Sequence, residues 1–353
     1  MNSSFTCDLN PGRIVFGAGS VERLGEELQR LGVERPLLLS TQQQKPDLER
    51  LAAGLGSRCA GLFTEAAMHT PVSVTQRALL AYDATGADGV VAFGGGSTIG
   101  LGKAIAWRND ARQLVIATTY AGSEVTPILG QTEDGVKTTV RDPRILPEVV
   151  IYDPALTLGL PVAMSVTSGL NAMAHAVEAL YAKDRNPIAS LQAVEGVRAL
   201  HEALPRIVQR PDDLVARGQA LMGSWLCGTV LGSVGMSLHH KLCHTLGGSF
   251  DLPHAETHAV MLPYSTSYNA IAAAQELKPL TTMFGDDLGQ GLREFALNLK
   301  APSSLQALGF KQADVERAAE LAVRNPYWNP RPVEREAVLA LLRRAWAGEP
   351  PIT

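Results

Sequence analysis

The chain has 353 residues, of which 46% are hydrophobic and 19% charged, so it can bury a sizeable core and is not expected to be disordered. Its 31 basic and 35 acidic residues leave a net charge of −4 without a basic run, which argues against a general nucleic-acid binder. Four scattered cysteines without metal-type spacing are typical of reduced thiols in a cytoplasmic protein, and neither a signal-peptide pattern nor an apolar run of membrane-spanning length is present.

Short apolar strands alternate with helical patterns in the first half of the chain. Ser20 stands where it could cap the first helix. Such alternation is typical of parallel βαβ units, so we expect residues 1–157 to form an α/β domain with a parallel, Rossmann-like sheet. Strands are predicted at residues 13–16, 36–40, 60–63, 89–93, 114–117 and 149–152, and helices at 21–31, 47–55, 72–85 and 98–107.

Long helical patterns replace this alternation after Asp153 and Pro154. Strand-like runs almost vanish, and no internal repeat is visible. We therefore expect residues 158–353 to form an all-α domain, which agrees with about 150 residues for each of two domains. The helices predicted most clearly cover residues 165–181, 188–204, 212–230 and 237–246, and others follow up to 346.

A glycine-rich turn ends the predicted strand at residues 89–93 and leads into a helix. Glycines let the backbone approach a phosphate, and the unpaired N–H groups of a helix start point toward it. The spacing is neither that of a Walker A loop nor that of GxGxxG, and a tight strand-to-helix turn without a ligand would look similar. The residues of this candidate anion site are Gly94, Gly95, Gly96, Ser97 and Thr98.

A second hydroxyl-rich turn follows the next strand. Ligands of open parallel sheets bind outside the carboxyl ends of the strands, so two such turns favour a nucleotide site. Neither an acidic residue for a ribose nor an arginine for a 2′-phosphate follows the second strand, so the sequence does not choose between NAD(H) and NADP(H). Beyond the glycine turn, the predicted cofactor-binding residues are Ser40, Thr41, Thr118, Thr119, Thr126, Lys137, Thr157 and Leu158.

Five of the eight histidines lie within residues 236–263, and histidine is the side chain most readily used for proton transfer or metal ligation near neutral pH. Asn171 and His175 share one helix face, as do His240 and His244, whereas His254 is predicted on a loop. Their convergence would resemble a Zn²⁺ or Fe²⁺ site in geometry, but a neutral amide at 171 leaves it under-charged for a metal. The five are His239, His240, His244, His254 and His258.

Other polar residues have weaker cases. His239 points about 100° away from its neighbour on a helix and is expected at the surface. His258 is expected to pack against or orient the histidine four residues before it. His201 is expected to be solvated, and Glu178 to be a structural partner of neighbouring helices. His69, at a turn, could line a cofactor cleft, but this is the weaker of the readings open for it.

Several motifs then combine into a resemblance that covers nearly the whole chain. On these motifs the chain resembles the iron-containing (group III) alcohol dehydrogenases, within them the branch of the maleylacetate reductases. The resemblance implies the dehydroquinate synthase-like fold plan: an N-terminal nucleotide-binding domain, a helical C-terminal domain, and a site in the cleft between. The motifs are RIVFGAG, GGGSTIGLGKAIA, TTYAGSEVTP, YDPALTLGLP, SVTSGLNAMAHAVEALYA, HHKLCHTLGGSFDLPHAETHAVMLPY and NPYWNPRPVEREAV.

The chain departs from the family's pattern at three positions. An amide replaces the ligand Asp, Gly100 replaces the Asp after the glycine turn, and Ala255 replaces the Gly of Pro-His-Gly. These departures match the maleylacetate reductase branch, which is regarded as working without metal. The resemblance also puts His244 beside the nicotinamide. The family's metal-ligand positions would fall on Asn171, His175, His240 and His254.

The resemblance implies metal-independent, NAD(P)H-dependent reduction of the carbon–carbon double bond of maleylacetate to 3-oxoadipate, late in the degradation of aromatic compounds. Preorganised donors must then stabilise the enolate that a metal ion would otherwise polarise. We expect His244 or His254 to be the general acid, and Lys241 and His240 to bind the substrate carboxylates. The predicted catalytic set is His244, His254, His175, His240, Lys241 and Asn171, with no metal ligand.

Two alternatives stay open from the sequence: a metal-dependent alcohol or polyol dehydrogenase of the same fold, and a non-catalytic nucleotide-binding protein. A lyase resembling dehydroquinate synthase would need a strong metal site, which Asn171 weakens. The resemblance implies a homodimer, formed by edge pairing of N-terminal strands, and a small dicarboxylate substrate. We expect a cytoplasmic protein with neither a nucleic-acid nor a membrane partner.

Overall fold

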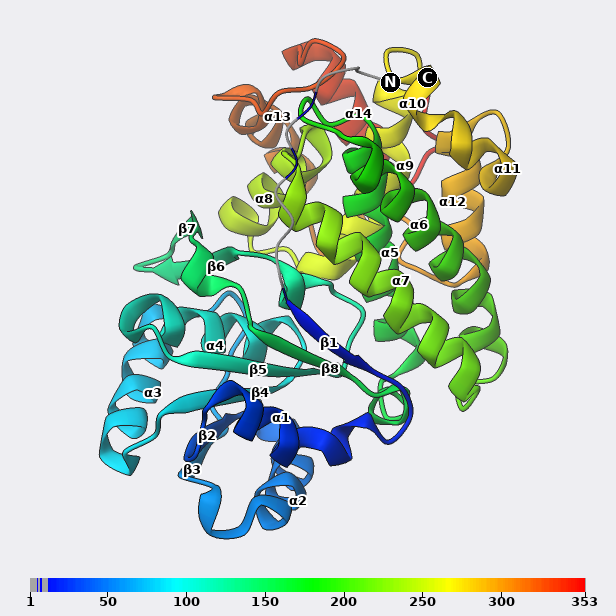
Figure 1. The fold of residues 1–353 in the computed structure, drawn as a ribbon. Coiled ribbons are helices and arrows are strands. Elements are labelled where there is room, and N and C mark those ends of the chain that lie inside the picture. Colours follow the sequence, from blue (N-terminus) through cyan, green and yellow to red (C-terminus); the bar gives the residue numbers. More distant parts are fainter. Residues whose placement is uncertain (1–4, 6, 8–11, 353) are drawn as a thin grey trace. The chain divides into compact units, whose positions relative to one another are not determined.

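The computed structural model describes residues 5, 7 and 12–352. The chain divides into a sheet unit, Leu9–Leu160, and a helical unit that runs from Pro161 to the C-terminus (Figure 1). The division comes just after the short 3-10 helix Pro154–Thr157, within which the predicted domain boundary lies.

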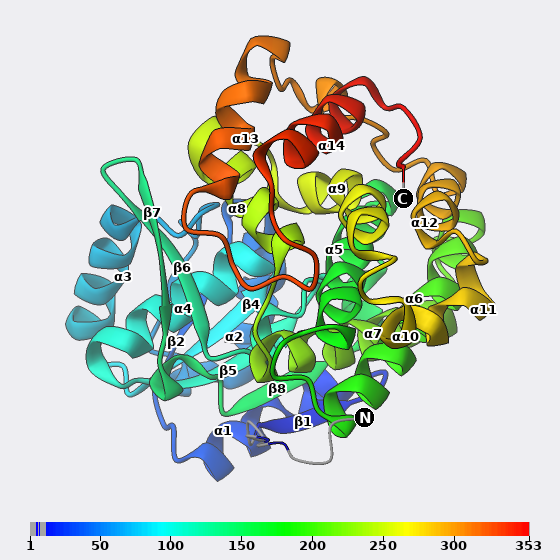
Figure 2. The ribbon, with the colours of Figure 1, turned by 90° about the horizontal axis from the view of Figure 1, so that it is seen from above.

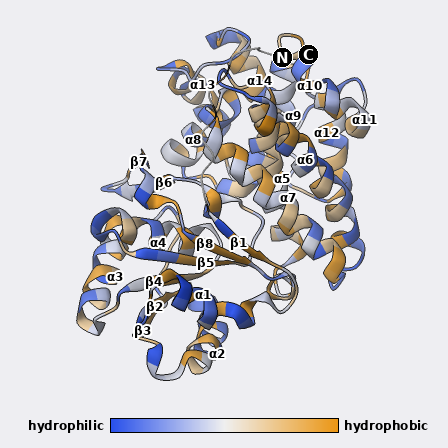
Figure 3. Ribbon diagram, in the orientation of Figure 1, coloured by the Kyte–Doolittle hydropathy of each residue, from blue (hydrophilic) through white to orange (hydrophobic). Residues whose placement is uncertain are grey.

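The sheet unit is built on six parallel strands in the order β1-β8-β5-β4-β2-β3. Every residue of β2, β4 and β8 is buried, as expected for a parallel sheet covered on both faces, and Figure 3 shows β5 and β8 as hydrophobic segments. The predicted α/β class is confirmed. The strands are β1 (Arg13–Phe16), β2 (Pro36–Leu39), β3 (Gly61–Phe63), β4 (Gly89–Gly94), β5 (Arg112–Ala117) and β8 (Val149–Tyr152).

Two apolar clusters fix helices to the two faces of this sheet. Leu28 and Leu48 pack with Leu38, so α1 and α2 cover one face. Leu101 packs with Leu37, on the opposite face, together with residues of α3. Alternate residues of β2 thus point into different cores, as the two-residue repeat of a strand requires. The helices are α1 (Leu24–Leu31), α2 (Lys45–Leu55), α3 (Val72–Thr85) and α4 (Gly96–Asn109).

Ser20 does not cap the first helix, contrary to the prediction. It begins a 3-10 turn, Ser20–Arg23, and is buried against the sheet. Its hydroxyl donates to the Tyr152 carbonyl oxygen at 3.2 Å, which leaves it unable to serve α1. The cap was predicted from local sequence alone, and the tertiary contact with β8 prevails.

An antiparallel hairpin, β6 (Ile128–Glu133) and β7 (Val136–Arg141), was not predicted. Asp134 and Gly135 form its two-residue turn with φ of 48° and 77°, the left-handed pair that such hairpins favour. Figure 2 shows the hairpin projecting as a narrow ribbon from the sheet unit.

The helical unit contains no strand among its described residues, in agreement with the predicted all-α class. Helix α5 is buried along almost its full length and packs against α6, α7 and α9 (Figure 2). The helices are α5 (Val162–Leu180), α6 (Pro187–Gln209), α7 (Leu214–Ser233), α8 (Leu238–Phe250), α9 (His254–Asn269), α10 (Ala274–Leu277), α11 (Thr281–Phe284), α12 (Leu288–Asn298), α13 (Val315–Val323) and α14 (Arg335–Ala347).

Two helices continue past signals that were expected to end them. Helix α6 passes through Pro205 to Gln209, and α8 passes through Gly247 and Gly248. The residue that ends α8 is Asp251, which adopts the left-handed conformation with φ of 55°. As a result His254 is the first residue of α9 rather than part of a long loop.

In the part of the chain that the structure describes, no single helix combines the length and apolar composition that crossing a bilayer requires. The bent pair of α7 and α8 reaches that length and composition only when the two helices are taken together.

Candidate functional site

The glycine turn at the end of β4 is packed too tightly to admit side chains. Gly94 has a φ of 153°, and a Cβ there would lie 2.6 Å from Thr98 Oγ1. A Cβ on Gly95 would lie 2.6 Å from Thr119 Cγ2, in the turn after β5. Helix α4 then starts at Gly96. The two predicted turns therefore do lie against each other, with the start of a 14-residue helix between them.

This turn offers what a nucleotide phosphate needs. Thr98 Oγ1 is buried and has no hydrogen-bond partner within residues 12–352. The first N–H groups of α4 lack partners inside the helix. The chain crosses from β3 back over β2 to β4 and continues to β5, so the turn stands where the strand order reverses, the usual ligand position in such sheets. The geometry of the sheet unit therefore fits a dinucleotide.

Gln44, which was not predicted, connects three loops at this edge. Its Nε2 donates to Thr118 Oγ1 at 3.0 Å, and its Oε1 lies close to Gly94. Ser40, after β2, is buried and donates to the Thr41 carbonyl oxygen at 2.9 Å. The polar run after β2 was the available signal for Gln44.

The remaining predicted cofactor residues differ from one another in burial and in hydrogen bonding. Thr126 Oγ1 is held by the buried Lys103 ammonium at 2.9 Å, and burial lowers the pKa of Lys103 to about 7 although Glu124 opposes this. Thr157 donates to the Pro154 carbonyl oxygen at 2.8 Å. Lys137 is half-buried on β7, Leu158 is exposed, and Ser97 is half-buried in the first turn of α4.

Gly100 faces a threonine that takes the space of a side chain. A Cβ on Gly100 would lie 2.3 Å from Thr70 Oγ1, which is not a tolerable separation. Thr70 and His69 both have positive φ, at 46° and 62°, and the Thr70 carbonyl oxygen accepts the Thr132 N–H from the hairpin. The absence of a carboxylate at position 100 is therefore built into the local packing.

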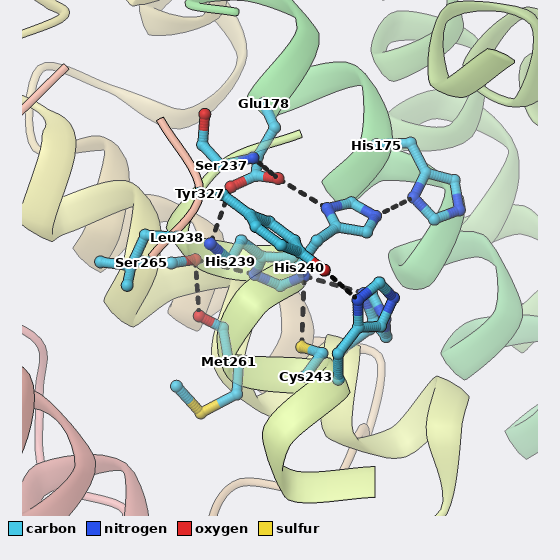
Figure 4. Close-up of polar contacts among 12 residues, drawn as sticks. His175, Glu178, Ser237, Leu238, His239, His240, Cys243, Met261, Ser265 and Tyr327 are labelled. Carbon is cyan, nitrogen blue, oxygen red and sulfur yellow. Dashed lines mark hydrogen bonds and ion pairs between the residues drawn. The ribbon is translucent and has the colours of Figure 1, made fainter. Parts of the chain in front are cut away.

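In the helical unit, helices α5, α8 and α9 bring six of the eight histidines together, of which Figure 4 labels His175, His239 and His240. Contacting rings have centroids 4.4–5.9 Å apart. We call this set the histidine cluster. It consists of His175, His239, His240, His244, His254 and His258.

Glu178 holds the cluster to the start of α8. Its carboxylate accepts the backbone N–H groups of Ser237 and His239 at 2.9 and 2.7 Å, and the side chain of His240 at 2.6 Å (Figure 4). Burial favours a raised pKa, but the hydrogen bond from His240 and the nearby imidazoles outweigh it and keep the pKa of Glu178 below its ordinary value. Glu178 was predicted to be structural, and its spacing of three residues from His175 was the signal for more.

His240 is engaged through both ring nitrogens. Nδ1 faces Glu178, and Nε2 lies 2.9 Å from Nδ1 of His175. Since the carboxylate accepts, Nδ1 of His240 carries a proton. No nitrogen of His240 is left to hold a substrate carboxylate, so the carboxylate-binding role expected for it does not follow from this geometry.

Two other histidines are not where the sequence suggested. His239 is buried rather than at the surface, with Nδ1 2.8 Å from Ser265 Oγ and Nε2 2.9 Å from Nδ1 of His258, and burial lowers its pKa to about 3. His201 is half-buried rather than solvated, stacked on Phe295, and burial lowers its pKa. A partner from a helix distant in sequence decides both cases, Ser265 on α9 for His239 and Phe295 on α12 for His201.

Two accessible basic residues of α8, His244 and Lys241, lie beside Tyr327, which sequence reasoning missed. His244 Nδ1 is 3.1 Å from the Tyr327 hydroxyl, and the Lys241 ammonium lies over the Tyr327 ring, 5.7 Å from its centre. Lys241 and His244 are half-buried, and His254 is exposed at the start of α9. Basic groups are therefore gathered where a solute can reach them.

The four positions that match the family's metal ligands lack the family's carboxylate. Nitrogens of His175 and His240 lie 2.9 Å apart, and Asn171 offers a neutral, buried Oδ1 that no described group contacts by hydrogen bonding. Among the described residues, convergent His, Cys or carboxylate ligand atoms occur only at His239, Cys243 and His258. The family positions therefore supply donors without the anionic ligand that a divalent ion favours.

Known proteins resemble this chain over nearly its whole length. The family profile "Iron-containing alcohol dehydrogenase" matches residues 11–154, and "Fe-containing alcohol dehydrogenase family, C-terminal" matches 165–346. Maleylacetate reductase from Rhizobium sp. strain MTP-10005 is 66% identical over 97% of both chains, and that from Burkholderia cepacia is 52% identical over 99% of both. The crystal structure of maleylacetate reductase from Agrobacterium tumefaciens has 65% identity and a TM-score of 0.96, covering 99% of this chain and 100% of its own. The chain belongs to the iron-containing alcohol dehydrogenase family and, within it, groups with the maleylacetate reductases.

Proposed function

We propose that this protein reduces the carbon–carbon double bond of maleylacetate to give 3-oxoadipate, with NADH or NADPH as the reductant. The observation that carries the proposal is the 66% identity with a maleylacetate reductase across 97% of both chains. The basic, carboxylate-poor histidine cluster supports it, because the substrate is a dicarboxylate.

NAD(P)H, when bound, supplies the hydride that adds to the double-bond carbon β to the ketone. The glycine turn and the N–H groups of α4 would hold its phosphates, with Thr98 Oγ1 as an additional donor. Ser40, after β2, offers neither charge that separates the two cofactors, so we propose NAD(P)H without a preference.

The accessible basic residues would bind the substrate carboxylates. Lys241 is a cation beside Tyr327, and His254 starts α9, where unpaired N–H groups and the helix dipole favour an anion. Glu178 does not compete for these groups, because its oxygens are occupied by three N–H donors.

We propose that His244 protonates the enolate that hydride addition leaves. The dipole at the start of α9 disfavours a protonated imidazole at His254, whereas His244 lies inside α8 and contacts the Tyr327 hydroxyl. Glu178 and His240 act as positioning residues, because together they fix the orientation of His175. Oriented donors would stabilise the enolate oxygen without a metal ion.

The decisive experiment follows NADH and NADPH absorbance with maleylacetate before and after treatment of the enzyme with a chelator. Equal turnover before and after chelation agrees with the proposal. Loss of activity that Fe²⁺ or Zn²⁺ restores would point to a metal-dependent dehydrogenase instead. No oxidation of either cofactor with any enone dicarboxylate would favour a non-catalytic nucleotide-binding protein.

We further propose that the protein is a cytoplasmic homodimer. Strand β1 stands at an edge of the sheet, where its outer N–H and C=O groups can pair with a second copy. Light scattering coupled to size exclusion tests this, and a mass of a single chain at micromolar concentration would contradict it.

A further inference from the structure

The geometry points to a binding site for a soft divalent cation, such as Zn²⁺ or Cd²⁺, formed by His239, Cys243 and His258. It is distinct from the four positions where the family's metal would be held. All three side chains are buried, and their ligand atoms lie within 4.8 Å of one another. Binding of the ion here is independent of the proposed reaction.

Hydrogen bonds around His239 show which of its nitrogens has a lone pair. The Ser265 hydroxyl donates to the Met261 carbonyl oxygen at 2.9 Å, so its oxygen is left to accept from His239 Nδ1–H at 2.8 Å (Figure 4). Nε2 therefore carries the lone pair. It faces both Cys243 Sγ, at 3.6 Å, and His258 Nδ1, at 2.9 Å.

The hydrogen bond to His239 also fixes which nitrogen of His258 carries the proton. Its Nδ1 must donate to the His239 lone pair, so its Nε2 is an acceptor. This Nε2 is buried and has no hydrogen-bond partner within the described chain. Moving the ring proton from Nδ1 to Nε2 therefore breaks no hydrogen bond of Nε2, and it leaves the Nδ1 lone pair available to an ion.

The distances suit tetrahedral coordination after a small adjustment. Zinc–nitrogen bonds of about 2.0–2.1 Å and a zinc–sulfur bond of about 2.3 Å place nitrogen and sulfur ligands about 3.6 Å apart, and two nitrogens about 3.4 Å apart. The first separation matches that of Cys243 and His239, and the second exceeds the present 2.9 Å between His239 and His258. The two rings would separate by about 0.5 Å when coordination replaces their hydrogen bond.

Binding of the cation requires two protons to move. The Cys243 thiol releases its proton to solvent and becomes a thiolate ligand. His258 exchanges its Nδ1 proton for one on Nε2, so its charge does not change and Nδ1 can coordinate.

Ring contacts join this site to His240 and His254, at 5.1 and 4.4 Å from His258, so an ion here would displace the cluster and inhibit the reaction. Only this inhibition rests on the proposed function.

The test is titration of the full-length, chelator-treated protein with Cd²⁺, followed by the thiolate-to-cadmium absorption band and by the metal content after desalting. We expect one tightly bound Cd²⁺ per chain and a band that Cys243→Ser abolishes. Cys227→Ala is the matched control, because Cys227 is also a buried thiol but lies outside the three-residue grouping, and it should keep the band. Absence of stoichiometric binding, or a band that persists in Cys243→Ser, would overturn the site.

A second variant keeps the test informative if Cys243→Ser does not fold. His258→Ala should weaken Cd²⁺ binding at least tenfold, while His201→Ala, on α6, should leave it unchanged. Circular dichroism and thermal unfolding report whether each variant is folded. Equal Cd²⁺ affinity in folded His258→Ala and wild type would remove His258 from the site. Cd²⁺ binding without inhibition would leave the site standing and contradict only its link to catalysis.

Discussion

The Glu178 carboxylate and Nδ1 of His240 form a buried hydrogen bond of 2.6 Å. Position 171, two turns earlier on the same face of α5, holds an amide where the family has its ligand carboxylate. A carboxylate therefore still lies against the histidine cluster, but its oxygens accept N–H groups of α8 and of the residue before it.

Replacing Glu178 by Gln should impair both folding and catalysis. Three N–H donors converge on this carboxylate, and an amide can accept on one atom only, so at least one donor loses its acceptor. We expect the free energy of unfolding to fall by about 1–3 kcal/mol and kcat to fall tenfold or more. Denaturant titration and steady-state kinetics measure the two, with Glu202→Gln as an exposed control on α6. A kcat that stays at the wild-type level would remove the positioning role.

Loss of His244 should reduce kcat far more than loss of His254. A positioned general acid contributes about 10²–10⁴ in rate, so His244→Ala should lose kcat in that range, whereas His254→Ala should mainly raise the KM for maleylacetate. Steady-state kinetics with varied maleylacetate separates the two, and His201→Ala is the control. The reverse pattern would make His254 the acid, and near-wild-type kcat in both would exclude each of them.

A methyl group at Gly95 should weaken cofactor binding. Its Cβ would lie 2.6 Å from Thr119 Cγ2 and force the two turns apart. We expect the KM for NAD(P)H to rise at least tenfold in Gly95→Ala, with a much smaller change in the KM for maleylacetate. Gly54→Ala, on α2, is the control, because nothing lies within 4 Å of the added methyl. Unchanged cofactor binding would mean that the glycine turn does not hold the phosphates.

Mild acid should destabilise the protein through His239. Its folded pKa is about 3, below the ordinary 6.5, so between these values the unfolded chain binds a proton that the folded chain does not. The free energy of unfolding must then fall as the pH falls below 6.5, by at most about 1.4 kcal/mol per pH unit for one histidine. Glu178, with a lowered pKa, adds the same sign only below 4.5, whereas burial raises the pKa of Glu124 and gives the opposite sign.

Burial also lowers the pKa of His258, which contributes with the same sign below pH 6.5, so the comparison that isolates His239 is wild type against His239→Gln. Urea unfolding between pH 7.5 and 5 should show a shallower pH dependence in the variant. If the free energy of unfolding had the same slope against pH in wild type and variant, His239 would be protonated in the folded protein as in the unfolded chain.

An aspartate at position 100 should not fit unless Thr70 changes with it. The Thr70 hydroxyl would lie 2.3 Å from the new Cβ. We expect Gly100→Asp to lower the melting temperature and weaken NAD(P)H binding, and Thr70→Gly to recover much of the loss in the double variant, since glycine also tolerates the φ of 46°. A double-mutant cycle measures this coupling, and strictly additive effects would contradict it.

The sequence predicted the parallel sheet and the helical unit because their signals are local. Buried strands such as β4 are continuous apolar runs, and α5 follows a helical repeat. The errors arose where distant contacts decide. Ser20 donates a hydrogen bond to a carbonyl oxygen of β8. Helix α6 continues past Pro205, where the sequence predicted that it would end. The hairpin at residues 128–141 was missed although Asp134 and Gly135 are a favourable turn pair, because its strands are partly exposed and β7 has no buried residue, so neither forms a continuous apolar run.

The sequence identified residues of the candidate site, but not which of them contact each other. Spacing identified His175, His240 and His244 as members of shared helix faces. It did not show that Glu178 faces His240, or that Tyr327 reaches His244 from a segment 83 residues away. Which nitrogen of an imidazole donates depends on such partners, so roles within the cluster require the three-dimensional arrangement.

The contact between Thr70 and Gly100 also bears on how this branch arose. If the ancestor carried an aspartate at position 100, glycine had to appear there before, or together with, a threonine in the present Thr70 conformation. Once both were in place, restoring the aspartate alone required the Thr70 side chain to move. The order of substitutions thus makes the return path costly, because a change at position 100 alone meets the Thr70 hydroxyl.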